Sequence, residues 1–233
     1  MLKKVFIKVA QKFLHRPDLV FSEEIPLSYF LSISIQRVFM LLRGYIRGIW
    51  FAKRGNRLFI GKNVSLKCAN KIHVGNGVSI QDGVKINALS KDGVWLGNNS
   101  SIGENTKIRV SGSLTEMGKS FHLGNYSTLA NDCFVGAAGG VEIGDYVAVG
   151  QNVRFHSENH EFSDPNILIC KQGTSHKGIK IGNDCWIGAG AVFLDGSEVG
   201  DGCVVGAGSI VTKKIPPYSV VAGIPARVIK ERK

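Results

Sequence analysis

Two histidines, four residues apart, lie in a polar stretch that interrupts an otherwise regular chain of 233 residues. Residues 153–162 read VRFHSENHEF and contain His156 and His160. An imidazole has an unperturbed pKa near ~6.5, so it can accept a proton at neutral pH. Such a group suits general base catalysis, in which it removes a proton from an attacking nucleophile. We therefore interpret this stretch as a candidate active site, and the elements around it must position the two rings.

A repeat of six residues runs along the chain on both sides of this stretch. Steps of six from Ile60 to Val211, with a few breaks, reach only large apolar residues, and glycine often follows them. A period of six is not helical, and it predicts a parallel β-helix in which short strands alternate with tight corners. The apolar residues would stack inside, and glycine would adopt the corner conformations that a Cβ forbids. The largest break follows Phe155, and the step resumes only at Ile181.

The composition of the chain changes near residue 58. Only three of the 29 glycines precede residue 59, and residues 1–58 contain 11 basic but 3 acidic residues. Residues 59–212 are nearly neutral, and residues 213–233 are again basic. We predict a mainly β protein in three parts: an N-terminal helical, basic, amphipathic segment (1–58), the β-helix (59–215) with an inserted loop (161–178), and a basic C-terminal tail (216–233).

The basic N-terminal segment leaves two interpretations open. Apolar residues between 25 and 57 recur at spacings of three and four, which predicts an amphipathic helix. The helix either packs on the main domain with a solvated basic face, or lies on a membrane with its apolar side in the lipid. A nucleic-acid partner is not expected, because the basic residues are not interleaved with exposed aromatics and form no binding motif.

The five cysteines form no CxxC pair and are odd in number. Lysines break the apolar run at the N-terminus, so no signal peptide is evident. These features predict a reducing, cytoplasmic location, with membrane association at its inner face as the alternative above. Cys133, Cys185 and Cys203 fall at a small inward position of the repeat, where we expect core packing rather than chemistry.

Residues 181–230 contain the most specific motifs of the chain: Trp186-Ile187-Gly188, the run GAGSIVTK over 206–213, and AGIPA over 222–226. This stretch resembles the C-terminal half of the hexapeptide-repeat acyltransferases. The resemblance covers roughly residues 60–230 and is closest to the maltose/galactoside O-acetyltransferase type and to the acetyltransferases of bacterial surface polysaccharide synthesis. It implies a left-handed parallel β-helix, an exception to the usual right-handed crossover. It also implies homotrimers that bind acetyl-CoA in grooves between subunits.

The resemblance makes His160 the general base, because His160 follows Ile143 at the offset that the sugar acetyltransferases use for their histidine. His156 is interpreted either as a substrate contact or as a surface residue. If successive coils stack in register, Glu142 would lie one coil from His160 and could hold its tautomer. Glu158 competes for that role and is a candidate substrate contact. The remaining candidates for the acceptor, from a looser match, are Asn131 and Asp132.

Seven further residues are implied in binding acetyl-CoA by the same resemblance. Small residues would border the pantetheine arm, a Thr-Lys step would lie near the adenosine, and basic residues would meet the phosphates, where lysine makes a weaker contact than arginine. A tryptophan would wall the groove or contact another subunit. These residues are, in that order, Ala189, Ala207, Thr212, Lys213, Arg227, Lys230 and Trp186.

Together these features predict an acetyl-CoA-dependent O-acetyltransferase that acts on a sugar hydroxyl in surface polysaccharide synthesis, such as that of capsule, O-antigen or exopolysaccharide. The alternatives are N-acetylation of a nucleotide-linked amino sugar and a non-catalytic scaffold. A third is hydration at a metal, as in γ-class carbonic anhydrases, because His122, His156 and His160 have a similar but shorter spacing. The C-terminal motifs favour CoA, so no metal is expected. The loop 161–178 is too long for a plain corner and would reach a neighbouring subunit, with His176 as a further candidate.

Overall fold

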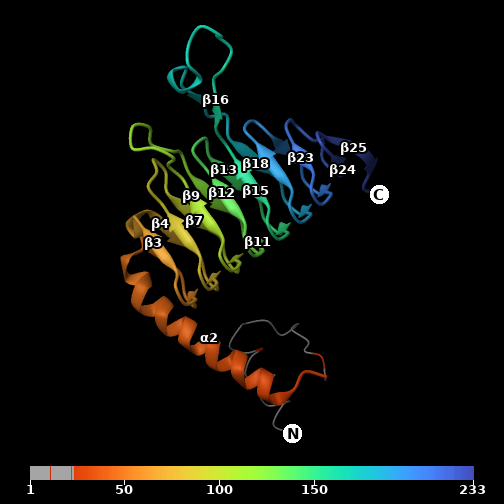
Figure 1. Cartoon of the computed structure of the whole chain (residues 1–233). Coiled ribbons are helices and arrows are strands. Elements are labelled where there is room, and N and C mark those ends of the chain that lie inside the picture. Colours follow the sequence, from red (N-terminus) through yellow and green to blue (C-terminus); the bar gives the residue numbers. More distant parts are fainter. Residues whose placement is uncertain (1–10, 12–21, 23) are drawn as a thin grey trace.

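A parallel β-helix built from three sheets makes up most of the protein (Figure 1). The computed structural model describes residues 11, 22 and 24–233, so the predicted N-terminal segment lies partly outside the described residues. Each turn of the β-helix, termed a coil, adds one short strand to each sheet. Strand pairing already begins at Lys53, before the predicted boundary at residue 58, and the division into three parts remains a prediction.

The three sheets are named A, B and C, and their strands follow one another along the β-helix axis. Sheet A contains β1 (Lys53–Arg54), β4 (Ile72–Val74), β7 (Val94–Leu96), β10 (Phe121–Leu123), β13 (Val141–Ile143), β18 (Ile179–Ile181) and β21 (Glu198–Val199). Sheet B contains β2 (Phe59–Ile60), β5 (Ser79–Ile80), β8 (Ser101–Ile102), β11 (Thr128–Leu129), β14 (Ala148–Val149), β19 (Trp186–Ile187), β22 (Val204–Val205), β24 (Ser219–Gly223) and β25 (Ala226–Glu231). Sheet C contains β3 (Ser65–Lys67), β6 (Lys85–Asn87), β9 (Lys107–Arg109), β12 (Phe134–Gly136), β15 (Arg154–His156), β20 (Val192–Leu194) and β23 (Ile210–Val211).

The remaining elements lie outside the coils. An antiparallel pair, β16 (Asn159–His160) and β17 (Thr174–Ser175), stands at the base of the inserted loop. Helix α2 (Leu27–Arg47) precedes the β-helix and continues into a 3₁₀ turn, η1 (Gly48–Trp50). Two further 3₁₀ turns are η2 (Ala69–Lys71) and η3 (Ile169–Lys171). No helix among the described residues is long and apolar enough to cross a membrane.

The inward residues of the strands form one apolar stack along the β-helix axis. Phe121, Phe155 and Phe193 are the largest of its fully buried side chains. The prediction that three cysteines pack in this core is confirmed, since all three are at most 2% exposed, and burial raises the pKa of Cys185 to about 11. These thiols are therefore poor nucleophiles.

The corners between sheets A and B are held together by side-chain amides and carboxylates. The backbone N–H of Asn98 donates to Asn125 Oδ1 at 2.8 Å, and that of Asn125 donates to Asp145 Oδ1 at 2.6 Å. The prediction that glycine adopts left-handed corner conformations holds at Gly77 and Gly202 but not at the glycine directly after each inward residue. Gly97 has no left-handed backbone but is needed for close approach, because a Cβ there would lie 2.6 Å from Asn125 N. The left-handed residue comes two positions later, for example Asn99 with φ 54°.

Helix α2 turns its basic side toward the β-helix rather than toward solvent. Arg37 donates to Ser79 Oγ at 2.9 Å, Arg43 to the Ile60 carbonyl at 2.8 Å, and Arg47 to the Val64 carbonyl at 2.7 Å. The helix approaches closely at Gly44, where a Cβ would overlap the Leu58 carbonyl. The predicted solvated basic face is therefore wrong, because these guanidinium groups satisfy hydrogen-bonding groups of the first coils. The exposed face of α2 and η1 is apolar instead, and its members are Leu31, Ile35, Val38, Phe39, Leu42, Tyr45, Ile46, Ile49 and Trp50.

Candidate active site

Strand β15 carries the first of the two histidines on the outer face of sheet C. Its central residue, Phe155, points inward and stacks on Phe193 with ring centroids 5.0 Å apart. Side chains alternate along a strand, so His156 points outward, where its ring lies 5.4 Å from that of Phe134. Partial burial lowers the pKa of His156 below its usual value, and the nearby Arg154 lowers it further. His156 is therefore neutral at physiological pH and can accept a hydrogen bond.

The inserted loop leaves and rejoins the β-helix at two fixed points. At the first, the buried Ser157 accepts the Gly139 N–H and donates to the Gly136 carbonyl, both at 3.0 Å. At the second, the carboxylate of Asp195 accepts the backbone N–H groups of residues 177 and 178, at 3.0 and 2.8 Å. The loop therefore has a rigid base.

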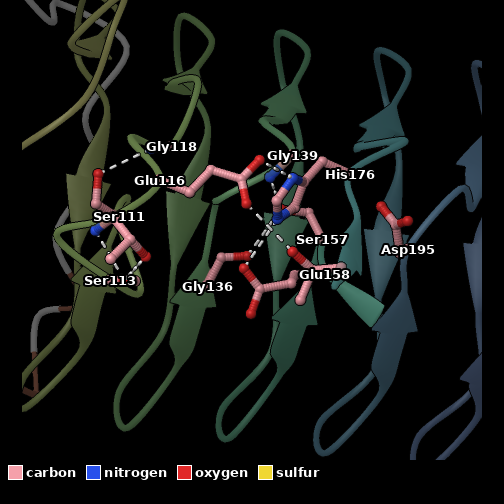
Figure 2. A network of polar contacts seen from close by, with 12 residues as sticks. Ser111, Ser113, Glu116, Gly118, Gly136, Gly139, Ser157, Glu158, His176 and Asp195 are labelled. Carbon is pink, nitrogen blue, oxygen red and sulfur yellow. Dashed lines mark hydrogen bonds and ion pairs between the residues drawn. The ribbon is translucent and has the colours of Figure 1, made fainter. Parts of the chain in front are cut away.

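A bridge of one histidine between two carboxylates joins the two limbs of the loop (Figure 2). His176 Nδ1 lies 3.2 Å from Glu116 Oε1, and His176 Nε2 lies 3.0 Å from Glu158 Oε2. Glu158 follows β15, His176 closes the loop, and Glu116 comes from a different loop, after β9. Glu158 was predicted as a substrate contact or as the partner of His160, but the contact formed in the structure is to His176. His176 thus holds the base of the loop in one chain.

His160 lies on the antiparallel pair above this bridge and is exposed. It pairs with Thr174 of β17, whose hydroxyl donates to Glu116 Oε2 at 3.3 Å. Beyond β16 and β17 the loop projects away from the body of the β-helix (Figure 1). The outer part of this loop, residues 161–173, carries exposed apolar side chains, including Phe162 and Leu168.

The predicted stacking of Glu142 beneath His160 is wrong. Glu142 pairs in sheet A with His122 on one side and Lys180 on the other, and its carboxylate lies 3.9 Å from Lys180 Nζ. The count along the sequence placed His160 in that column, but the chain leaves the coil at Ser157 and returns to sheet A only at β18. Glu142 lines a shallow hollow over sheet A that contains no residue of the inserted loop.

One corner, between sheets B and C, collects candidates for both substrates. The residues at equivalent places in successive coils are Lys62, Asp82, Glu104, Asn131, Gln151, Ala189 and Ala207. The Asn131 amide oxygen accepts the Glu104 N–H at 2.9 Å, and Asp132 has a left-handed φ of 60°. In the last two coils the residues at this corner are alanine and glycine, so only small side chains line it. A Cβ on Gly208 would meet no atom within 4 Å, so space is open there.

The other residues assigned to acetyl-CoA surround the last coils. Trp186 is 61% exposed on the outer face of sheet B, three residues before Ala189. Arg227 and Lys230 lie exposed on β25, which pairs with β24 at the edge of sheet B. The two remaining residues, Thr212 and Lys213, are exposed and follow β23 at the far end of sheet C.

The three histidines of the metal alternative lie on different parts of the chain. His122 is on sheet A, where its ring lies 5.9 Å from that of Trp95, His156 is on sheet C, and His160 is on the loop. Within the described range, no three histidine, cysteine or acidic side chains form a group that could hold a metal ion. The described residues of one chain therefore do not assemble the histidine set of the carbonic-anhydrase alternative.

Sequence reasoning missed the residues that fix the loop: Ser157, Asp195 and Glu116. Ser157 and Glu116 lie where the six-residue step breaks, whereas Asp195 lies in a regular step, in the coil that follows the insertion. Ser157 and Asp195 do have a signal, since each is a polar residue at the corner between sheets C and A in the two coils that flank the insertion. Glu116 has none, because it lies in a different loop and meets His176 only through the fold.

Comparison with known proteins agrees with this architecture. The family model described as bacterial transferase hexapeptide (six repeats) matches residues 178–213. A probable acetyltransferase of Mycobacterium tuberculosis is 30% identical over 206 residues, which is 87% of this chain and 64% of that protein. The galactoside O-acetyltransferase of Escherichia coli is 37% identical over 142 residues, 57% of this chain and 64% of that protein. The chain thus spans slightly less than two thirds of the length of these relatives.

The structure also resembles a solved one. A mutant of AntD, an N-acyltransferase from Bacillus cereus crystallised with dTDP and coenzyme A, superposes with a TM-score of 0.56 at 21% identity, covering 82% of this chain and 89% of that one. The likeness concerns the fold alone, and with the family match it confirms the predicted left-handed parallel β-helix, while α2 supplies the predicted N-terminal helix. The chain is thus a hexapeptide-repeat β-helix protein that resembles the bacterial hexapeptide acyltransferases, as its C-terminal motifs predicted.

Proposed function

We propose that the protein is an acetyl-CoA-dependent O-acetyltransferase that acts on a sugar hydroxyl in surface polysaccharide synthesis. The observation that carries the proposal is the corner between sheets B and C in the last two coils. Its side chains there are small, Ala189 and Ala207, and the space beside Gly208 is open. A thin pantetheine arm fits such a corner, because small residues let it approach the backbone amides. The similarity to two acetyltransferases supports the same donor.

In the proposed reaction His160 acts as the general base. It takes the proton of the acceptor hydroxyl while that oxygen attacks the thioester carbonyl, and the CoA thiolate leaves and is protonated. The rigid base of the loop, set by Ser157, Asp195 and the bridge at His176, would hold the imidazole in position. Arg227 and Lys230 would meet the CoA phosphates, with Thr212 and Lys213 near the adenosine.

The active form is proposed to be a homotrimer. In one chain His160 is exposed, and the projecting loop presents Phe162, Leu168 and Ile169 to solvent. Apolar side chains on a projecting loop are typical of a contact with another subunit, which would also wall the site and exclude water. Light scattering is expected to give three times the chain mass of 25.2 kDa.

Replacing the proposed base gives the direct test. His160→Ala is expected to lower kcat about 10²–10⁴-fold, the usual contribution of a general base. The rate is followed as CoA thiol release from acetyl-CoA with a panel of oligosaccharides, free sugars and nucleotide-linked amino sugars. The control is Asn159→Ala, an exposed neighbour on the same strand, which should keep most of the rate.

Two results of this assay would change the proposal. An unchanged rate in His160→Ala would remove the residue from the mechanism. Thiol release only with nucleotide-linked amino sugars would replace O-acetylation with N-acetylation, the alternative reaction.

We further propose a cytoplasmic protein that rests on the inner membrane face through the apolar side of α2. The support is the row of exposed apolar residues along α2 and η1, with the arginines turned away from it, and five cysteines without a disulfide. Because burying each of these side chains contributes about 1.5–3 kcal/mol, the triple variant Ile35→Ser, Leu42→Ser, Ile46→Ser should bind liposomes at least roughly a hundredfold more weakly. Flotation with anionic vesicles measures this, and Leu114→Ser, an exposed leucine outside α2, is the control. Equal flotation of the triple variant and the parent protein would contradict the membrane proposal.

A further inference from the structure

The outer face of sheet C carries positive charge in four of its first five strands, all except β12. Two outward positions per strand give five exposed cations, and no strand of sheet C contains an aspartate or a glutamate. Sheet A differs, because its outward column combines Glu142, Lys180 and Glu198. The five cations of sheet C, which we call the cationic row, are Lys67, Lys85, Lys107, Arg109 and Arg154.

The register places like charges of the cationic row beside one another. Lys85 of β6 pairs directly with Lys107 of β9, and like charges opposite each other on adjacent strands destabilise a sheet. No ion pair within the described part of the chain involves any member of the row. Arg109 does have partners, but they are the neutral backbone carbonyls of Ser111 and Gly112, at 3.3 and 3.0 Å. The row therefore lacks the counter-charge that an anionic ligand would supply.

A half-buried aromatic ring interrupts the row next to the candidate active site. Phe134 occupies the column between Lys107 and Arg154, and its ring lies over Gly136, where a Cβ would come within 3.1 Å of it. The same ring contacts His156. A flat apolar surface beside cations suits a sugar ring that carries an acidic substituent, since its apolar face can pack on the aromatic ring.

The length of the row favours an extended ligand over a single phosphate. Strands β3 to β15 are four steps apart, which at about 4.8 Å per step gives roughly 19 Å. One phosphate or diphosphate would leave most of the row unpaired. A single-stranded nucleic acid would fit the charge, but this face of sheet C offers only the adjacent rings of Phe134 and His156 for base stacking, where such sites use aromatic rings along the strand.

We propose that the outer face of sheet C binds an acidic polysaccharide, with its carboxylates on the cationic row and one sugar ring on Phe134, and that this chain is the acetyl acceptor. The proposal rests on the proposed acetyltransferase function and narrows its substrate to glycans that bear uronic acid. The acceptor would run along the β-helix axis toward His156 and the loop that carries His160.

The test compares direct binding with turnover. A fluorescent oligogalacturonate and the same oligosaccharide with its carboxyl groups reduced to alcohols are titrated with the full-length protein, and each is also offered as acceptor with acetyl-CoA. The acid form should bind at least about tenfold more tightly, and increasingly so as salt is lowered. Lys85→Gln with Lys107→Gln should weaken its binding about three- to tenfold. The control, Lys53→Gln with Lys91→Gln, removes the same charge outside sheet C and should leave the affinity unchanged.

The outcomes separate this proposal from the proposed function. Equal binding of the acid and reduced forms, or equal losses in the two double variants, would overturn the acidic-glycan proposal even if acetyl transfer occurs. A second outcome is selective binding of the acid form that is weakened in the Lys85–Lys107 variant but leads to no thiol release. This would support the binding surface and contradict the proposed acetyltransferase function. Tighter binding of an oligodeoxynucleotide of equal charge would overturn the choice of a glycan. The thermal midpoint of the Lys85–Lys107 variant should be equal or higher, because it removes a like-charge pair.

Discussion

Two regions of sheet C, its first five strands and its last two strands, have the same interior and different exteriors. Inside, apolar residues continue without a change of character from Ile86 through Phe155 to Val211. Outside, the first five strands carry the cationic row, whereas β20 and β23 present Val192, Leu194 and Ile210, which are only half-exposed. The inserted loop leaves the coil at the boundary between these two regions.

This difference shows that a hexapeptide coil separates folding from recognition. Inward residues and corner glycines must satisfy the stacking of coils, so they vary little in kind. Outward residues carry no such constraint and can differ from coil to coil. A polar acceptor would therefore be recognised on the first five strands of sheet C. The thin, partly apolar arm of acetyl-CoA would bind beside the last two strands, where the corner residues are small. The predictions below test whether these two regions of sheet C have separate ligands.

Filling the small corner is expected to have the larger effect. Ala207→Phe places an aromatic ring where the structure leaves room for the pantetheine arm. Overpacking typically costs about 1–3 kcal/mol, so the KM for acetyl-CoA should rise roughly ten- to hundredfold, while the KM for the acceptor stays within about twofold. Steady-state kinetics with each substrate varied in turn measures both values.

A matched change earlier on the same corner provides the control. Glu104→Phe introduces the same ring three coils before Ala189, and it should leave the KM for acetyl-CoA unchanged. If Glu104→Phe and Ala207→Phe raise that KM equally, the division of the corner into two regions is wrong. If neither does, acetyl-CoA lies elsewhere.

The fold was predictable because its signal repeats. Every coil supplies an inward residue, and no single break hides the period, so the β-helix and the buried Cys133, Cys185 and Cys203 followed from spacing alone. The placement of Glu142 failed at the largest break in the period, which follows Phe155. Counting residues assumes that the chain stays in the coil. The chain leaves the coil at Ser157, whose hydrogen bonds are to Gly136 and Gly139, about twenty residues earlier.

Two other features could not be read from the chain for a related reason. Periodicity shows that α2 has an apolar and a basic side, but it does not tell which side packs on the β-helix. The choice depends on carbonyls such as that of Ile60, which accepts a hydrogen bond from Arg43. Likewise, the bridge of His176 to Glu116 and Glu158 joins three segments that only the fold brings together.

The smallest expected effect concerns the charge of His156, on β15, where the two regions of sheet C meet. Burial lowers the pKa of this imidazole most, and Arg154 lowers it further. Arg154→Gln removes the second cause and keeps the first, so the pKa of His156 should rise part of the way toward its ordinary value of 6.5. Titration of the imidazole Cε1 proton by NMR measures this shift, with Lys53→Gln as a distant control.

The same change has a consequence for stability that fixes its sign. A histidine whose folded pKa is lowered binds fewer protons than the unfolded chain in the window below 6.5, so its contribution to stability is present above 6.5 and is lost as the pH falls through the folded pKa. Arg154→Gln narrows that window and should reduce the loss of stability on acidification. If the pKa of His156 does not move in Arg154→Gln, the cationic row exerts no electrostatic field at this ring. The charge of the first five strands of sheet C would then not influence the histidine at their boundary with the last two.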